Sequence, residues 1–136
     1  MKLFEEKLCG LDPGFGVELM ILAAPEVEAK VRRAMTIRGA RYLHVFVPCP
    51  LGWGHASDQT IRIARLAKET GVFPVFEAVD GEVTGSSKIR RRMPVEEYLK
   101  PQKRFAHLFA PKPRPEVIAR IQELANRNIR RYELLD

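Results

Sequence analysis

The chain has 136 residues and a mass of 15.5 kDa, near the commonest size of a single domain. Its composition, 46% apolar and 29% charged residues, is typical of a folded globular protein and excludes wholesale disorder. No window approaches the roughly 18 uninterrupted apolar residues of a membrane span. The N-terminus carries acidic residues where a secretory signal needs an apolar core. We therefore expect a cytoplasmic protein with no membrane partner.

The formal net charge of +6 comes from a basic excess that is concentrated between residues 88 and 104 and near the C-terminus. Such an excess suits nucleic acid, an acidic partner protein, or a solvated surface. No nucleic-acid motif accompanies it, so we favour a solvated or protein-facing surface over direct binding of nucleic acid. The segment 88–92 could dock an acidic protein such as a small electron carrier.

The N-terminal half alternates apolar runs with helical patterns. Residues 17–23 form the first apolar run, and a helix is expected from Pro25 or Glu26 to Gly39, because proline and acidic residues suit a helix start. Residues 42–47 form the second run, which is rich in β-branched and aromatic residues and predicts a strand.

The middle of the chain repeats this alternation. Ser57 is expected to cap a helix that ends at Gly71, and residues 72–79 form the third apolar run. Pro74 within that run indicates a strand that lies at an edge or starts late. Asp80-Gly81 then predicts a hairpin turn.

The C-terminal part predicts helices. A short helical piece is expected at residues 95–99, after which the chain carries an amphipathic helix. Its apolar stripe comprises Val117, Ile118, Ile121, Leu124, Ala125 and Ile129.

Together these elements predict an α/β fold with a parallel sheet built from βαβ units, a hairpin and a helical C-terminal arm. We expect one domain over residues 1–136. Within it, residues 1–15 would form an N-terminal extension, residues 16–84 the sheet core, and residues 85–136 the arm.

The loop after the second strand is the first place to expect chemistry, because ligands of parallel sheets bind beyond the carboxyl ends of the strands. Residues 48–55 read Pro-Cys-Pro-Leu-Gly-Trp-Gly-His. Cys49 could be a small buried apolar residue, a nucleophile assisted by His55, or a metal or cluster ligand that needs companions from elsewhere. The second cysteine, Cys9, lies forty residues away, so no disulfide framework can be read.

Other candidates have simpler interpretations. His44 is expected within the second strand as a sheet residue, and His107 as a surface histidine near a helix end. Trp53 is expected to be a packing anchor. The glycine-rich residues 10–16 lack the spacing of a phosphate-binding loop and are expected to form a turn or linker.

Beyond these patterns, the chain resembles a known family. Residues 41–54, Arg-Tyr-Leu-His-Val-Phe-Val-Pro-Cys-Pro-Leu-Gly-Trp-Gly, are similar to the matching segment of β subunits of 2-oxoacid:ferredoxin oxidoreductases, particularly the pyruvate synthase type. The similarity continues through residues 60–77 and resumes at residues 93–100 and 102–108, so that it covers most of residues 16–108. The Pro-Cys-Pro-x-Gly-Trp loop and the later Pro-Val-x-Glu-Tyr-Leu segment are specific as a pair.

The resemblance implies a cofactor environment. In that family the β subunit binds thiamine diphosphate with magnesium and holds a 4Fe–4S cluster, whose last ligand lies in the loop equivalent to residues 48–50. The resemblance therefore implies that Cys49 is the position of a cluster ligand. It also implies that the fold is the C-terminal part of a thiamine-diphosphate-binding-type domain.

The chain departs from the family where the cofactors bind. It has no Gly-Asp-Gly motif with its downstream asparagine to hold magnesium and the diphosphate, and no Cys-x-x-Cys pair. Cys9 lies in an unmatched stretch and takes no role from the resemblance. What remains resembles the C-terminal half of a β subunit, beginning at its own methionine.

Two functions follow from this comparison. In the first, the chain is a partial β subunit whose Cys49 completes a cluster shared with another chain, with other oxidoreductase subunits and ferredoxin as partners. In the second, it is a non-catalytic assembly or binding module that has kept the fold without the thiamine and cluster sites, and pairs with such a subunit or with itself.

Overall fold

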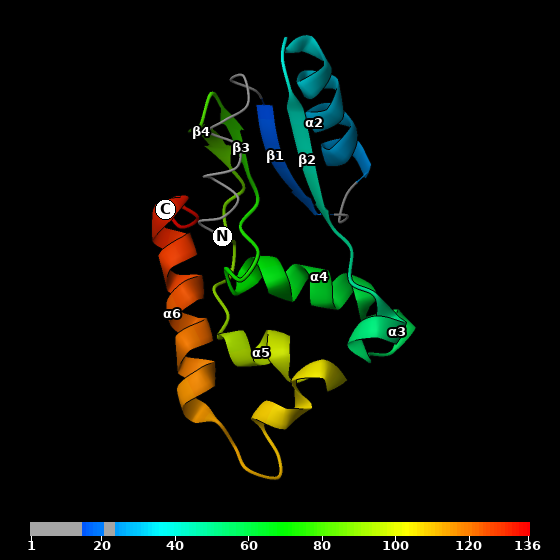
Figure 1. Ribbon diagram of the computed structural model, residues 1–136, viewed down its shortest axis with the longest axis vertical. Helices are drawn as coiled ribbons and strands as arrows, with labels where there is room; N and C mark the ends of the chain where they lie inside the picture. Colours follow the sequence, from blue (N-terminus) through cyan, green and yellow to red (C-terminus); the bar gives the residue numbers. More distant parts are fainter. Residues whose placement is uncertain (1–14, 21–23) are drawn as a thin grey trace. The chain divides into compact units, whose positions relative to one another are not determined.

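The computed structural model describes residues 15–20 and 24–136 (Figure 1). The chain divides into two compact units: Met1–Phe46 with Val75–Ser86, and Val47–Pro74 with Ser87–Asp136. Residues 47–74 are thus grouped with the C-terminal residues, which differs from the predicted division into a sheet core (16–84) and an arm (85–136). The N-terminal extension expected at residues 1–15 lies, except for Phe15, outside the described residues.

The first unit contains a four-stranded sheet in the order β2-β1-β3-β4. Strands β1 (Phe15–Met20) and β2 (Arg41–Phe46) pair in parallel and are joined by helix α2 (Ala24–Thr36), which lies beside them (Figure 1). This is the predicted βαβ unit. Ala34 of α2 is buried, and half-buried apolar side chains from the helix and the sheet pack around it: Val27, Ile37, Leu43 and Val79.

The rest of the sheet corrects the prediction of a parallel sheet. Strand β3 (Phe76–Val79) runs antiparallel to β1, and β4 (Glu82–Ser86) runs antiparallel to β3. The sheet is therefore mixed: among its described strands, β1 and β2 pair in parallel and the other two pairs are antiparallel. The apolar run at residues 72–79 could not reveal this, because apolar character marks burial and does not set the direction of a strand.

Two details of β3 follow from its sequence. The strand starts two residues after Pro74, so the expected late start is confirmed, whereas an edge position is wrong because β3 lies between β1 and β4. The predicted hairpin is also confirmed. Asp80 and Gly81 both have positive φ, 54° and 83°, as the tight turns between antiparallel strands require.

The second unit is helical. The expected helices at 95–99 and in the C-terminal segment are confirmed, although Leu124 of the predicted apolar stripe is 49% exposed. None of the helices among the described residues is long and apolar enough to cross a bilayer. The unit comprises α3 (Pro50–Trp53), α4 (Thr60–Glu69), α5 (Val95–Leu99), α6 (Pro115–Arg131) and the 3-10 turns η1 (Ser57–Gln59) and η2 (Lys103–Leu108).

The start of α4 differs from the sequence prediction. Ser57 does not cap this helix, because it begins η1 and its carbonyl accepts a hydrogen bond from Thr60 Oγ1 at 2.8 Å. The residue before the helix, Gln59, makes no side-chain cap either. A one-turn 3-10 segment therefore leads the chain into α4 in place of a serine cap.

A buried contact between the ends of two helices organises the core of this unit. Gly71, just after α4, has φ 76°, and its carbonyl accepts a hydrogen bond from Asn128 Nδ2 of α6 at 3.0 Å. A Cβ on Gly71 would lie 2.7 Å from Cγ1 of Ile129. Only glycine satisfies both the left-handed backbone and this close approach. Apolar side chains fill the core on either side: Ile63, Leu66, Val95, Leu99, Ala125 and Leu134.

This contact generates a stability prediction. Gly71→Ala should lower the free energy of unfolding by about 2 kcal/mol, because it adds left-handed strain and a clash with Ile129. Gly85→Ala is the matched control, since a Cβ there meets no atom within 4 Å, and it should change stability by less than about 0.5 kcal/mol. Chemical denaturation measures both variants, and equal effects would contradict the role given to Gly71.

Candidate functional site

Cys49 lies on a tight turn at the start of α3 in the second unit. Its thiol is free, the residue is exposed, and its Sγ accepts a hydrogen bond from the Gly52 N–H at 3.4 Å. Its carbonyl accepts from the Trp53 N–H at 2.9 Å. The two prolines that flank it fix φ on either side. The turn therefore holds the sulfur in a defined position while leaving it accessible.

The other end of this turn is fastened to η2. Gly54 has φ 68°, and its N–H donates to the Pro50 carbonyl at 2.9 Å. Its own carbonyl accepts from the Lys103 N–H at 3.2 Å, and a Cβ on Gly54 would lie only 2.7 Å from the Cβ of Lys103. The glycine therefore permits the turn to approach the backbone of η2 closely.

The expected packing role of Trp53 is confirmed, and the side chain that packs on its ring is an arginine. The guanidinium of Arg104 lies over the indole ring with its Cζ 3.8 Å from the ring centroid, and it lies 4.6 Å from the ring centroid of Phe105. Arginine stacks well on aromatic faces because its planar cation is attracted to the π electrons. The contact joins α3 to η2 through side chains as well as backbone.

Arg104 is itself held by two residues that are buried. Its Nε donates to Oε1 of Gln102 at 2.9 Å, and its Nη2 donates to the Tyr98 hydroxyl at 2.9 Å. Gln102 is 1% exposed and Tyr98 is 3% exposed. Burial raises the pKa of Tyr98 above 10.0, and the nearby Arg104 charge and the hydrogen bonds from Gln102 and Arg104 oppose that rise.

Sequence reasoning missed this network of Tyr98, Gln102 and Arg104. The three residues lie in segments that carried the family resemblance, 93–100 and 102–108, but neither segment contains a catalytic motif. Their link to Cys49 depends on tertiary contacts, so only the resemblance marked them.

The histidines have separate surroundings. Nδ1 of His55 lies 2.9 Å from the Ala56 carbonyl, and among the described residues no hydrogen bond joins His55 to Cys49. The expectation of His55 as a partner for a nucleophilic Cys49 therefore gains no geometric support. His44 is in β2, and His107 is exposed in the last turn of η2, as expected from the sequence.

The described part of the chain does not assemble a complete metal site. Within residues 15–20 and 24–136, no group of three or more histidine, cysteine, aspartate or glutamate side chains is placed to hold a metal ion. Cys49 can therefore offer a single sulfur ligand from this part of the chain. The exposed position of the thiol suits a ligand that meets donors from elsewhere. Cys9 lies outside the described residues.

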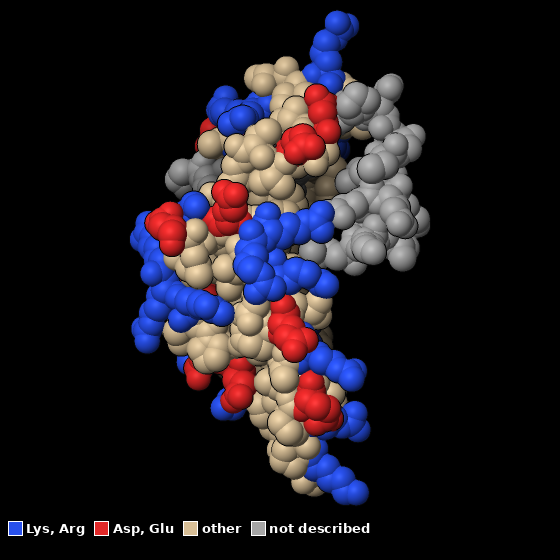
Figure 2. Space-filling view, turned by 90° about the vertical axis from the view of Figure 1, so that its left-hand side faces the viewer, with Lys and Arg blue, Asp and Glu red and all other residues tan. Residues whose placement is uncertain are grey.

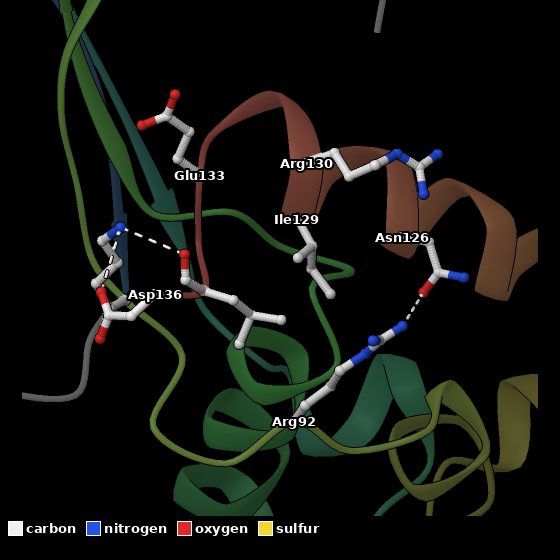
Figure 3. A pocket seen from close by; sticks show the side chains of 8 residues that line it. Arg92, Asn126, Ile129, Arg130, Glu133 and Asp136 are labelled. Carbon is white, nitrogen blue, oxygen red and sulfur yellow. Dashed lines mark hydrogen bonds and ion pairs between the residues drawn. The ribbon is translucent and has the colours of Figure 1, made fainter.

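A separate surface pocket lies beside the C-terminal end of α6. It measures about 680 Å³ and is lined by basic, acidic and apolar side chains (Figure 3). Arg92 donates to Asn126 Oδ1 at 2.8 Å, and Lys88 forms an ion pair of 3.5 Å with Asp136. Because the charges within it are mixed, the pocket is not specific for an anion.

The surface around this pocket is basic. Lys and Arg side chains gather on the side of the molecule that carries α6 (Figure 2). The term basic surface is used for a set of exposed lysine and arginine residues: Lys88, Arg90, Arg91, Arg92, Arg127, Arg130 and Arg131. The Ile89 N–H donates a hydrogen bond to the Leu134 carbonyl at 2.7 Å. This bond brings together the two segments that carry the basic surface, residues 88–92 and the C-terminal end of α6.

Known proteins resemble this chain over most of its length. Pyruvate synthase subunit PorB of Methanosarcina barkeri is 46% identical over 105 residues, which are 77% of this chain and 36% of that protein. PorB of Thermotoga maritima is 36% identical over 108 residues, 79% of this chain and 33% of that protein. Ketoisovalerate oxidoreductase subunit VorB of Pyrococcus abyssi is 40% identical over 81 residues, 58% of this chain and 26% of that protein.

The chain thus matches about a third of the length of the PorB relatives. No family model matches it.

The buried Tyr98 predicts a loss of stability at alkaline pH. Its raised pKa means that the folded state keeps a proton that the unfolded state releases above pH 10.0. Its contribution to stability is therefore present below pH 10.0 and is lost as the pH rises through the folded-state pKa. In Tyr98→Phe the free energy of unfolding should fall less steeply above pH 10.0. Urea denaturation over a pH series tests this, and equal slopes in the two proteins would contradict it.

Proposed function

This chain is a relative of part of the β subunit of pyruvate synthase, a 2-oxoacid:ferredoxin oxidoreductase, and on that premise we propose that it serves as a partial β subunit of such an enzyme. The reaction is the oxidative decarboxylation of a 2-oxoacid with coenzyme A, in which electrons leave through iron–sulfur clusters to ferredoxin. The relatives bear the names of both a pyruvate and a ketoisovalerate enzyme, so the class of substrate is the 2-oxoacids.

The observation that carries this proposal is the position of Cys49. Its exposed sulfur lies on a turn held by proline, glycine and a hydrogen bond from the Gly52 N–H. Hydrogen bonds from backbone N–H groups to cysteine sulfur are among the features that set the reduction potential of iron–sulfur clusters. A cluster bound here would take up and release single electrons. Cys49 would be its ligand from this chain, and the other ligands would come from another chain.

The same turn presents an apolar side chain for contact with that chain. Leu51 is 95% exposed, although it is a large apolar residue two positions from Cys49. Removing such an exposed apolar side chain from water, by covering it with another chain, is favourable. We therefore assign Leu51 to the interface where the other ligands of the cluster are supplied.

Thiamine diphosphate and magnesium belong to the other part of the proposed enzyme. This chain has no Gly-Asp-Gly motif in its sequence, and its residues 15–20 and 24–136 hold no group of three or more His, Cys, Asp or Glu side chains placed for a metal ion. Its contribution to the reaction is therefore the cluster ligand and a subunit interface. The cytoplasmic location, the thiamine-type fold and the single-domain organisation expected from the sequence stay predictions.

The proposed role of Cys49 predicts the outcome of reconstitution. Anaerobic treatment with iron and sulfide, in the presence of the co-expressed oxidoreductase subunits, should give iron–sulfur absorbance in the assembled complex. Cys49→Ser should lower that absorbance by the contribution of the shared cluster, because serine removes its sulfur ligand, and Cys9→Ser should leave the absorbance unchanged. If complexes with the wild-type chain and with Cys49→Ser assemble and give the same absorbance, the chain is an assembly module and not a cluster-ligand subunit.

The basic surface predicts how ferredoxin would bind. Complementary charge raises association rates and makes them sensitive to salt, so Arg90→Glu with Arg91→Glu should slow association of the complex with ferredoxin by about tenfold at low salt. Lys112→Glu, an exposed charge reversal outside the basic surface, is the control. Stopped-flow kinetics measures the rates. Equal rates in all variants, or steeply salt-dependent binding of the unmodified chain to duplex DNA, would contradict the assignment.

A further inference from the structure

We propose that Arg104 is a positioning residue for Cys49, and that its stack on Trp53 holds the cluster-ligand turn in place. This inference deepens the proposed function and rests on it for the role of Cys49 as a ligand. The turn from Cys49 to Gly54 buries none of the residues of α3, so it lacks a core of its own. Its position must therefore come from contacts with a neighbouring element.

Arg104 supplies that contact from a fixed position. Its guanidinium is fixed by hydrogen bonds to Gln102 and Tyr98, both buried, and the Gln102 side chain also donates to the backbone carbonyl of Tyr98. An arginine that is hydrogen-bonded in its plane and stacked on its face has little remaining rotational freedom. The cation over the Trp53 ring is therefore pre-organised, which reduces the entropic cost of holding the indole.

The contact reaches the thiol through one helical turn. Trp53 carries the N–H that bonds to the Cys49 carbonyl, and the preceding Gly52 carries the N–H that bonds to Sγ. A displacement of Trp53 therefore disturbs both hydrogen bonds at once. Ligand groups of a functional site need positions fixed to about 0.5 Å, so a loosened Trp53 would compromise the sulfur even though Cys49 itself is intact.

The variant Arg104→Lys distinguishes stacking by the planar guanidinium from an effect of positive charge alone. Arg104→Lys keeps the positive charge, but it loses the planar group that stacks on Trp53 and also bonds to Gln102 and Tyr98. We therefore expect Arg104→Lys to behave like Arg104→Ala. The matched control is Arg120→Ala, which removes an exposed arginine from α6.

Two measurements on the chain alone, without a cluster, test whether the Arg104–Trp53 stack holds the turn. Hydrogen exchange of the Trp53 and Gly54 amides should become roughly tenfold faster in both Arg104 variants, which corresponds to losing a cation–π contact of the usual strength. Amides in the middle of α6 should exchange at the unmodified rate, which shows that the fold persists. Because Trp53 is the single tryptophan of the chain, its fluorescence should shift to longer wavelength in the same variants. Unchanged exchange and emission in both variants would overturn the proposal.

A third measurement tests whether the Arg104–Trp53 stack affects the cluster. In the reconstituted complex, the Arg104 variants should bind a cluster whose electron paramagnetic resonance spectrum is broadened or shifted relative to that of the Arg120→Ala control. An unchanged spectrum in Arg104→Lys, together with loss of the cluster in Cys49→Ser, would overturn the positioning role and leave the proposed function intact. If Cys49→Ser retains the cluster, the proposed function fails, and the exchange measurement still decides whether Arg104 holds the turn.

Discussion

The candidate site depends on the stacking of one guanidinium on one indole ring. Arg104 places its charge 3.8 Å from the Trp53 ring centroid while its donors bond to Gln102 and Tyr98. Without that contact, the turn that carries Cys49 would lose its cation–π link to η2 and keep the backbone hydrogen bond from Lys103 and the packing of Gly54 against Lys103. A short helix without buried residues has little stability in water by itself, so the geometry of the thiol depends on a residue more than fifty positions away in the sequence.

The sequence predicted the local elements of the fold better than their arrangement. The helix between the first two strands, the Asp80-Gly81 hairpin and the late start after Pro74 follow from the conformational limits of individual residues, which act over a few positions. The direction of β3 does not, because pairing with β1 depends on how distant segments meet. For the same reason the sequence did not show that residues 47–74 pack with the C-terminal helices.

The candidate site was predicted in part. The prolines and glycines around Cys49 indicated a fixed loop, and Trp53 was correctly expected to pack. The residues that hold the loop could not be found this way, since Tyr98, Gln102 and Arg104 are ordinary residue types at ordinary spacing. Their contacts depend on the packing of η2 against α3 and of α5 against α4, although the family resemblance already included the segments that contain them.

The central claim, that Cys49 is a ligand of a shared cluster, can be tested at the level of the bond. The chain would be prepared with ¹³C at the β-carbon of cysteine in a Cys9→Ser background and assembled with unlabelled partner subunits. Electron–nuclear double resonance of the reduced cluster should then show a ¹³C hyperfine coupling, because the sulfur bonded to that carbon carries unpaired spin density. A reduced cluster without any ¹³C coupling would show that its ligands come from elsewhere and would contradict the account.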